Sequence, residues 1–422
     1  MSYKVRDRLK IIGGKKLKGE VKVQTSKNAT LPIMSASLLA EGKVYLKDCP
    51  DIIDVQNMAK ILKKLGANIV RTQDDYLIDS SNIKDVCLDY DLCKTMRSSI
   101  FLLGSTLSKF QSICLTMPGG CKIGKRPIDI HIEAFRRLNV KVTQLDDFVF
   151  FNASKARAGK IRLKLPSVGA TENIVQFACK LKGKTIIYNS AREPEVVDLC
   201  NFLNKMGAKI YGAGTKKITI IGVEKLQGVE YKPISDRIVL GTLLVATAIC
   251  GGTIRLIDKN INQNKKLIEI LSLMGCQINI KNDIITLSRD VPLKSVQKIC
   301  TGYYPNFPTD LQSMLMVLNC VANGQTRIDE QVFENRFLIV GELKKMGAKI
   351  DIVNNHTAIV SGVRQLKAGK LKAYDLRGGA SLVLAGLVAK GETIIENVHY
   401  IDRGYCHIEN MLKSLGADIE RI

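Results

Sequence analysis

Long apolar segments recur along the chain, and similar elements follow each of them. They occupy residues 28–42, 96–110, 170–183, 236–252, 310–324 and 376–391. Drawn as helices, these segments are apolar on nearly all sides, which is typical of buried helices. A short strand is predicted directly after each one, often led by glycine, as in GKTIIYN (183–189) and GETIIEN (391–397). The pattern therefore predicts six repeats of one α/β arrangement.

A second, amphipathic helix that ends at a glycine is predicted in every repeat. The motif reads LKKLGANI at 62–69, LNKMGAKI at 203–210 and LKKMGAKI at 343–350. Its glycine recurs 68 to 73 residues apart, at 66, 207, 275, 347 and 416, with Asn139 in its place in the second repeat. Glycine favours the left-handed residue that closes a helix, and asparagine tolerates it. A period near 70 residues exceeds that of common solenoids, so each repeat is a block of several elements.

The sixth repeat stops at Ile422 before its last strands, and the start of the chain carries a matching sequence. LKIIGGKKLKGEV (9–21) resembles ITIIGVEKLQGVE (218–230). We therefore expect the N-terminal residues to complete the sixth repeat. The chain then divides into two domains of three repeats, one of residues 22–232 and the other of residues 1–21 with 233–422. A cleft between two such domains is a common place for a ligand.

Composition narrows the class of protein. A chain of 422 residues is long enough for two domains, and 46% apolar residues with a mean hydropathy of +0.05 indicate a folded protein. Because no run of 18 apolar residues and no signal-like N-terminus occur, we expect neither a membrane span nor secretion, and a cytoplasmic location. The 12 cysteines include no CxxC pair, which argues against zinc-ribbon and thioredoxin-type sites.

The net charge of +23 leaves two interpretations open. Basic proteins bind nucleic acids, but here Lys and Arg are spread along the whole chain. Tryptophan is absent and aromatic residues are 5% of the chain, so stacking platforms for single strands are not expected. We therefore expect no nucleic-acid partner, and favour a basic surface or a cleft for a small molecule with several anionic groups.

Polar residues stand at the start of each buried helix. They are Lys27 with Asn28, Arg97, Ser167 to Gly169, Asp236 with Arg237, Asp310, and Arg377. Each could be a simple helix cap. However, repeats place equivalent helix starts on one rim, and the positive ends of helices favour phosphates and carboxylates. Arg192, Arg336 and Arg403 form a second set in the polar connections.

One connection, in the second repeat, is longer than the others and carries a cysteine. Cys121 follows two glycines and is close to Lys122, Lys125 and Arg126. Basic neighbours favour the thiolate and attract anions, and the glycines permit closure over a ligand. The alternative is an incidental thiol in a surface turn.

Several longer motifs together resemble the UDP-N-acetylglucosamine 1-carboxyvinyltransferases, a group of enolpyruvyl transferases. The resemblance covers essentially the whole chain. Its motifs are SKNATLP (26–32), TMRSSI (95–100), PGGCKIGKRPIDIH (118–131), PSVGATEN (166–173), AREPEVVDL (191–199), FPTDLQ (307–312), FENRF (333–337), DLRGGASLVLAG (375–386) and IDRGY (401–405). The enolpyruvyl transferases of the shikimate pathway share the fold but not the cysteine motif.

This resemblance implies a fold and a reaction. The fold is two inside-out α/β prism domains of three repeats each. The reaction transfers enolpyruvyl from phosphoenolpyruvate to the 3-hydroxyl of UDP-N-acetylglucosamine and releases phosphate, the first committed step of peptidoglycan synthesis. No cofactor and no metal are implied, and the partners are the two small substrates. Two alternatives remain: another acceptor such as shikimate 3-phosphate, and a non-catalytic protein built on a retired enzyme. The oligomeric state is open, with a monomer as the expectation.

The resemblance also implies residue roles. Cys121 matches the loop cysteine that protonates the methylene carbon of phosphoenolpyruvate and that the epoxide antibiotic fosfomycin modifies. Lys27, Arg126 and Arg403 match groups that hold phosphoenolpyruvate. Asp310 matches the base at the 3-hydroxyl, and Asn28 a contact to the amino sugar.

Further matches concern the nucleotide sugar. Arg97 matches a cleft arginine, and Ser167, Val168 and Gly169 match contacts to the diphosphate. Val332 matches a backbone contact to the sugar, and Arg377 an inter-domain arginine near the phosphate. The uridine-binding run corresponds to Arg126, Pro127, Ile128, Asp129 and Ile130. Arg336 is either a substrate contact or an ion-pair residue that holds the domain. Leu165 stands where some relatives have lysine, which leaves one diphosphate contact open.

Overall fold

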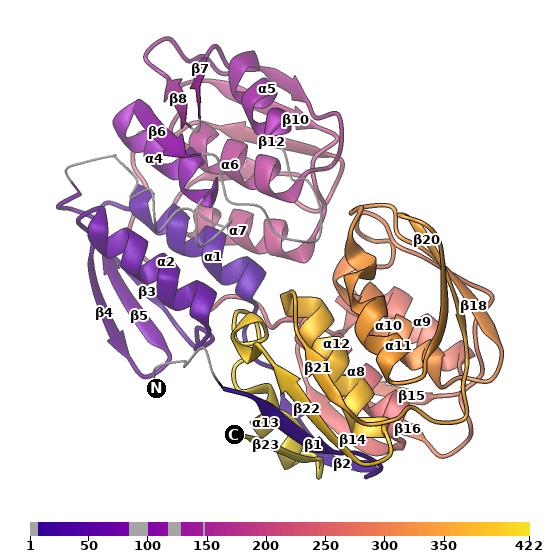
Figure 1. The fold of residues 1–422 in the computed structure, drawn as a ribbon. Helices are drawn as coiled ribbons and strands as arrows, with labels where there is room; N and C mark the ends of the chain where they lie inside the picture. The colour runs from indigo at the N-terminus through magenta and orange to yellow at the C-terminus, as the bar shows by residue number, and fades with distance from the viewer. Residues whose placement is uncertain (1–6, 84–99, 117–127, 147) are drawn as a thin grey trace. The chain divides into compact units, whose positions relative to one another are not determined.

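The chain folds into two units, each with three copies of one α/β arrangement (Figure 1). The computed structural model describes residues 7–83, 100–116, 128–146 and 148–422. We call the described residues of 25–234 the first unit. The second unit comprises residues 7–24 and 235–422.

Five of the six sheets found among the described residues have four strands in the same order. In the sheet β9-β10-β12-β11, the short first strand runs parallel to the second, and the other neighbours are antiparallel. Its strands are β9 (Lys160–Arg162), β10 (Lys184–Tyr188), β12 (Lys217–Ile221) and β11 (Lys209–Tyr211). The pairing is in register from Lys184 opposite Ile221 to Tyr188 opposite Lys217.

The first unit has two more sheets. One is β13-β3-β5-β4, with β13 (Glu230–Tyr231), β3 (Lys43–Leu46), β5 (Asp75–Asp79) and β4 (Asn68–Thr72). The other, with three described strands, is β6-β8-β7, with β6 (Ser112–Thr116), β8 (Phe148–Asn152) and β7 (Lys141–Leu145).

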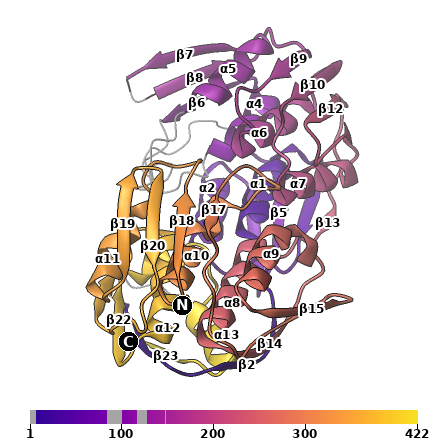
Figure 2. The ribbon, with the colours of Figure 1, turned by 90° about the vertical axis from the view of Figure 1, so that its right-hand side faces the viewer.

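The three sheets of the second unit repeat this order, which can be followed in Figure 2 for the second of them. The first is β2 (Leu17–Lys22), β14 (Gly252–Ile257), β16 (Ile284–Arg289) and β15 (Gln277–Lys281). The second is β17 (Lys298–Cys300), β18 (Gln325–Asp329), β20 (Thr357–Ser361) and β19 (Lys349–Asn354). The third is β21 (Lys370–Lys372), β22 (Glu392–Glu396), β1 (Leu9–Ile12) and β23 (Asp418–Arg421).

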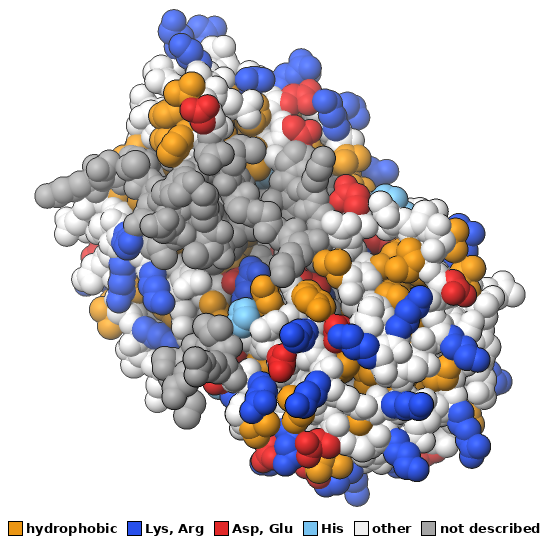
Figure 3. Space-filling model, in the orientation of Figure 1, with side chains coloured by type: hydrophobic (Ala, Val, Ile, Leu, Met, Phe, Trp, Pro, Cys, Tyr) orange, Lys and Arg blue, Asp and Glu red, His pale blue; other side chains and the backbone are white. Residues whose placement is uncertain are grey.

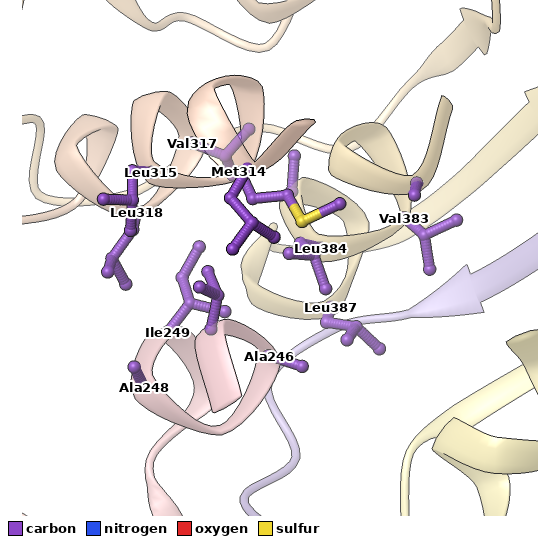
Figure 4. Packing of buried hydrophobic residues seen from close by; sticks show 14 of the residues in the cluster. Ala246, Ala248, Ile249, Met314, Leu315, Val317, Leu318, Val383, Leu384 and Leu387 are labelled. Atoms are coloured by element: carbon purple, nitrogen blue, oxygen red, sulfur yellow. The ribbon is translucent and has the colours of Figure 1, made fainter. Parts of the chain in front are cut away.

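The apolar segments form the buried helices, as predicted. In the first unit these are α1 (Lys27–Ala36), α4 (Leu102–Phe110) and α6 (Val168–Ala178). In the second unit they are α8 (Arg237–Cys250), α10 (Gln312–Cys320) and α12 (Leu376–Val388). Side chains of α8, α10 and α12, such as Ile249, Met314 and Leu384, converge at the centre of the second unit (Figure 4). Because helices are inside and sheets outside, each unit is an inside-out α/β prism. Truncating one of these core side chains to alanine costs about 2–5 kcal/mol.

The amphipathic helices end where the repeated glycine predicts. These helices are α2 (Ile53–Lys64), α5 (Asp129–Arg137), α7 (Pro194–Lys205), α9 (Lys265–Leu273), α11 (Val340–Lys345) and α13 (Ile408–Ser414). The repeat position has a positive φ in all six cases, from 63° at Asn139 to 105° at Gly207. A backbone of this kind favours glycine or asparagine, so the interpretation of the motif as a helix stop is confirmed. The described residues also form short 3-10 helices in the connections and next to the α-helices: η1 (Ser37–Leu39), η3 (Ile261–Asn264), η4 (Thr309–Leu311), η5 (Arg336–Ile339) and η6 (Val398–Tyr400).

The N-terminal strand completes the last sheet, as the sequence match predicts. Strand β1 lies between β22 and β23, with Leu9 opposite both Ile395 and Arg421. In the equivalent sheet of the first unit, β12 occupies the same place between β10 and β11. The next strand, β2, pairs in parallel with β14.

The distribution of charged side chains on the surface can be compared with the net charge of the chain. On the face of the second unit seen in Figure 3, Lys and Arg side chains are scattered and Asp and Glu side chains lie among them. Within the part of the chain that the structure describes, no helix has the length and apolar character needed to span a membrane.

Candidate active site

A carboxylate bound by two arginines lies at the start of α10 in the second unit. Asp310 Oδ1 accepts a hydrogen bond from Arg377 Nε at 3.2 Å and another from Arg336 Nη2 at 3.3 Å. Both arginine side chains are 4% exposed, whereas the Asp310 side chain is 28% exposed. The structure therefore brings three predicted site residues together, and it leaves the carboxylate accessible.

Three aspartates lie at the starts of the buried helices of this unit, and their carboxylates have different hydrogen-bond partners. Asp236 accepts from the backbone N–H groups of Ile238 and Val239 and so caps α8, and Asp375 caps α12 through the N–H groups of Arg377 and Gly378. Asp310 makes no capping hydrogen bond, because it lies inside η4 and α10 begins two residues later. The helix-cap interpretation of Asp310 is therefore wrong, and its carboxylate faces cations instead.

The surrounding charges keep Asp310 ionised. Burial opposes ionisation, but the guanidinium groups of Arg377, Arg336 and Arg237 outweigh it and hold the pKa of Asp310 below its usual range. Arg377 is also tied on its other side, because its Nη1 donates to Tyr405 Oη at 3.3 Å and that hydroxyl contacts Thr242 Oγ1 at 2.8 Å. This group of side chains has the chemistry to bind an anion and to accept a proton.

A buried glutamate braces the other side of the group. Glu330 Oε2 accepts from the hydroxyl of Thr309, which in turn accepts from Arg336 Nε at 3.2 Å. Glu330 Oε1 accepts from the backbone N–H groups of Val332 and Phe333 at 2.8 and 3.1 Å. Glu330 therefore fixes the Val332 backbone and the arginine together. Since the N–H of Val332 is already bonded, a ligand contact at this residue would use its carbonyl oxygen.

Arg403 lies in the turn between η6 and α13. Its neighbours Asp402 and Gly404 are buried, and Arg403 itself is half-buried. Gln24 ties this turn to the segment after β2, because its Nε2 donates to Gly404 O and its Oε1 accepts from Cys406 N. Tyr405, two residues after Arg403, is the hydroxyl partner of Arg377 described above.

Lys27 begins α1 in the first unit. Ser26 caps the helix through Ala29 N, which places Lys27 and Asn28 in the first turn. Lys27 Nζ forms an ion pair of 3.0 Å with Asp54 Oδ2 of α2, and the two side chains are 12% and 3% exposed. Its ammonium is therefore held in place by a buried carboxylate and is not a solvated surface charge.

Two predicted nucleotide-sugar segments lie side by side in the first unit. Ser167 caps α6 through Ala170 N, and Val168 and Gly169 form its first turn. Buried His131, which follows the run 128–130 in α5, packs against Gly169. A Cβ atom added at Gly169 would lie 3.2 Å from His131 Nε2. His131 therefore packs on a residue that has no side chain.

Four of the predicted site residues lie outside the described residues: Arg97, Cys121, Arg126 and Pro127. The burial of the other cysteines indicates how reactive their thiols are. Burial raises the pKa of the thiols of Cys49, Cys179, Cys200, Cys250, Cys276 and Cys320. Because the thiolate is the reactive form, these thiols are poor nucleophiles at neutral pH. Across the described ranges, no group of three or more His, Cys, Asp or Glu side chains is placed to hold a metal ion.

Comparison with known families agrees with this architecture. The family model for EPSP synthase (3-phosphoshikimate 1-carboxyvinyltransferase) matches residues 11–412. A UDP-N-acetylglucosamine 1-carboxyvinyltransferase of Clostridium perfringens is 44% identical, covering 99% of this chain and 100% of that protein. A protein of the same name from Caldanaerobacter subterraneus is 43% identical, covering 98% of this chain and 99% of that one. The chain belongs to the UDP-N-acetylglucosamine 1-carboxyvinyltransferase family.

Solved structures support the same fold. The enolpyruvyl transferase NikO from Streptomyces tendae has a TM-score of 0.88 and 25% identity, covering 99% of both chains. An EPSP synthase from Acinetobacter baumannii has a TM-score of 0.77 at 18% identity, covering 99% of this chain and 100% of that one.

Sequence reasoning missed several residues that position the predicted ones. Asp54, Thr309 and Tyr405 contact Lys27, Arg336 and Arg377 respectively, and Glu330 reaches Arg336 through the Thr309 hydroxyl. None of the four stood out in the sequence. Arg237 was noted only as a polar residue at a helix start, and it contributes to the charge around Asp310. The quoted motifs FPTDLQ and IDRGY did contain Thr309 and Tyr405, so a search for polar side chains next to predicted site residues would have found those two.

Proposed function

We propose that the protein transfers the enolpyruvyl group of phosphoenolpyruvate to the 3-hydroxyl of UDP-N-acetylglucosamine and releases phosphate. The observation that carries the proposal is the match over nearly the whole chain to relatives named for this reaction, at 42 to 44% identity. The geometry of the second unit supports it, because an accessible, ionised carboxylate stands among guanidinium groups.

In this proposal Asp310 takes the proton of the acceptor hydroxyl. It is ionised at neutral pH because the surrounding guanidinium groups lower its pKa, and Arg336 and Arg377 orient it. Arg377 and Arg403 contribute positive charge toward the phosphate and carboxylate of phosphoenolpyruvate, for which guanidinium forks are suited. The Val332 backbone, braced by Glu330, contacts the sugar.

Residues 27–169 contribute the remaining groups. Lys27, with Arg126, holds phosphoenolpyruvate, and Asn28 contacts the amino sugar. At the start of α6, Val168 and Gly169 offer backbone N–H groups to the diphosphate, which is the usual way a helix N-terminus binds phosphate. Ser167, whose own N–H donates to Leu165 O, contacts the diphosphate beside them. Cys121 supplies the proton to the methylene carbon. Arg97 and residues 126–130 hold the nucleotide.

The test is release of phosphate from phosphoenolpyruvate with each acceptor in turn. We expect release with UDP-N-acetylglucosamine and none above background with shikimate 3-phosphate. Release only with shikimate 3-phosphate would favour the alternative acceptor, and release with neither would favour the non-catalytic alternative. A cytoplasmic role in peptidoglycan synthesis, sensitivity to fosfomycin and a monomeric state belong to the same proposal. Sedimentation of the purified protein tests the last of these.

A further inference from the structure

The turn that carries Arg403 is flanked by two buried carboxylates. Asp402 directly precedes Arg403, and Glu409 lies in the first turn of α13. Their side chains are 2% and 8% exposed. Two buried carboxylates this close in sequence need a cation, because an unpaired buried charge is costly.

A single guanidinium binds both carboxylates. Arg421 of β23 donates to Asp402 through Nη1 and Nη2 at 2.9 and 2.7 Å, and to Glu409 through Nε and Nη2 at 2.8 and 3.1 Å. Asp7 lies 3.5 Å from the same group. The Arg421 side chain is 19% exposed, so solvent screens these contacts little. The rigid fork of arginine fits two carboxylates at once, which a lysine ammonium does not.

The strand that carries Arg421 is itself fixed. Strand β23 pairs with β1 over its whole length, and Ile422 exchanges two backbone hydrogen bonds with Arg8 at 2.9 Å. The guanidinium therefore ties the start of the Arg403 turn and the start of α13 to the sheet. On the other side, Gln24 holds Gly404 and Cys406.

We propose that Arg421 is a positioning residue for the enolpyruvyl-transfer reaction, which sets the Arg403 backbone through Asp402 without touching substrate. This inference rests on the proposed function, in which Arg403 holds phosphoenolpyruvate. It predicts a selective defect: loss of Arg421 weakens binding of phosphoenolpyruvate more than binding of the nucleotide sugar.

The experiment compares Arg421→Met, which has no charge, and Arg421→Lys, which has the charge without the fork. The matched control is Arg255→Met. Arg255 forms an exposed ion pair of 3.1 Å with Glu20 between two strands of the same unit, away from the Arg403 turn. For each protein we would measure kcat, both KM values, and amide hydrogen exchange of residues 401–408.

We expect Arg421→Met to raise the KM for phosphoenolpyruvate by at least about tenfold, since a misplacement of 1 Å can cost about 10²-fold. The KM for UDP-N-acetylglucosamine should change by less than about threefold, and exchange at 401–408 should accelerate. Arg421→Lys should fall between Arg421→Met and wild type, and Arg255→Met should match wild type.

Three outcomes would overturn the inference: an unchanged KM for phosphoenolpyruvate, an equal rise in both KM values, or unchanged exchange at 401–408. Failure of the proposed function has a different signature, because the wild-type protein would then release no phosphate with this acceptor. In that case, titration of wild type and Arg421→Met with phosphoenolpyruvate alone, together with the exchange data, still decides whether Arg421 positions the turn.

Discussion

Replacing Asp310 by asparagine separates a catalytic base from a mere counter-ion. The substitution preserves size and one acceptor oxygen but removes the negative charge between two arginines that are each 4% exposed. Removing one partner of a buried ion pair costs about 3–5 kcal/mol. Because the Asp310 side chain is 28% exposed, water can partly replace it, and we expect a loss of about 2–3 kcal/mol in the free energy of unfolding.

The kinetic effect should exceed what this destabilisation explains. Loss of a positioned base lowers turnover by about 10²-fold or more, while substrate binding should stay within about tenfold of wild type. Asp290→Asn is a suitable control, since Asp290 is an exposed carboxylate of the same unit, 73% exposed and paired with Lys16 at 3.5 Å. It should leave both stability and turnover unchanged.

A second substitution sharpens the test. In Asp310→Asn with Arg336→Met, one of the two uncompensated guanidinium groups is removed as well. If Asp310 is the base, the double variant regains part of its stability but not its turnover. Recovery of turnover together with stability, or near-normal turnover in Asp310→Asn alone, would refute the assignment of Asp310 as the base.

The pH dependence follows from the lowered pKa of Asp310. A carboxyl group whose folded-state pKa is lowered contributes stability above its unfolded pKa of about 3.9, and this contribution is lost as the pH falls toward the folded value. The stability difference between wild type and Asp310→Asn should therefore be constant between pH 5 and 8 and shrink below about pH 4. Urea unfolding across this range measures it, and a difference that already changes between pH 5 and 7 would contradict the charge arrangement.

Three further predictions concern the first unit and the cysteine. Burial, together with nearby carboxylates, raises the pKa of Glu172. Above about pH 4.5 the folded state therefore keeps a proton that the unfolded state loses, so wild type loses stability as the pH rises toward the folded pKa. Glu172→Gln should therefore gain on wild type by about 1.4 kcal/mol per pH unit in urea unfolding over that window, and parallel pH curves would contradict this. Asp54→Asn should lower the free energy of unfolding by about 3 kcal/mol, because it removes the buried carboxylate that pairs with the Lys27 ammonium. The control is the same change at exposed Asp48, which should lower the free energy of unfolding by less than about 1 kcal/mol. Equal losses in the two variants would contradict the argument from burial. Fosfomycin should label Cys121 before any other cysteine, and it should do so faster when the nucleotide sugar is bound. Mass spectrometry after brief exposure measures this labelling. If another cysteine is labelled first, Cys121 has no special role in the mechanism.

The repeat architecture was predictable because its signals are local. The glycine that ends each amphipathic helix needs only a left-handed backbone, and Asn139 satisfies the same need. The match between residues 9–21 and 218–230 placed β1 correctly because both segments fill the same position in equivalent sheets. The parallel strands β9 and β17, in contrast, have three residues each and show no periodicity of their own. They form because the neighbouring strand is present.

The site was predictable only in part, for a different reason. Asp236, Asp310 and Asp375 all stand at helix starts, so one sequence pattern fits all three. Only the fold shows that two of them cap helices and that Asp310 binds arginines. Arg421 is 19 residues from Asp402, in a strand whose sequence suggests no role in a site. Contacts of this kind depend on which sheet edge and which turn are brought together, and no local pattern records that.

The place of β1 between β22 and β23 has a consequence for the order in which the protein folds on the ribosome. The partners of β1, residues 392–395 and 418–421, are synthesised long after it, so β1 must wait until both of these strands have been made. The described residues of the first unit come from one continuous stretch and can assemble while the second unit is still incomplete. Until then β1, with its alternating apolar residues Leu9 and Ile11, is an unpaired strand of a nascent chain, a state in which strands associate with wrong partners. A chaperone that binds the emerging N-terminus would therefore protect the sheet that is finished last.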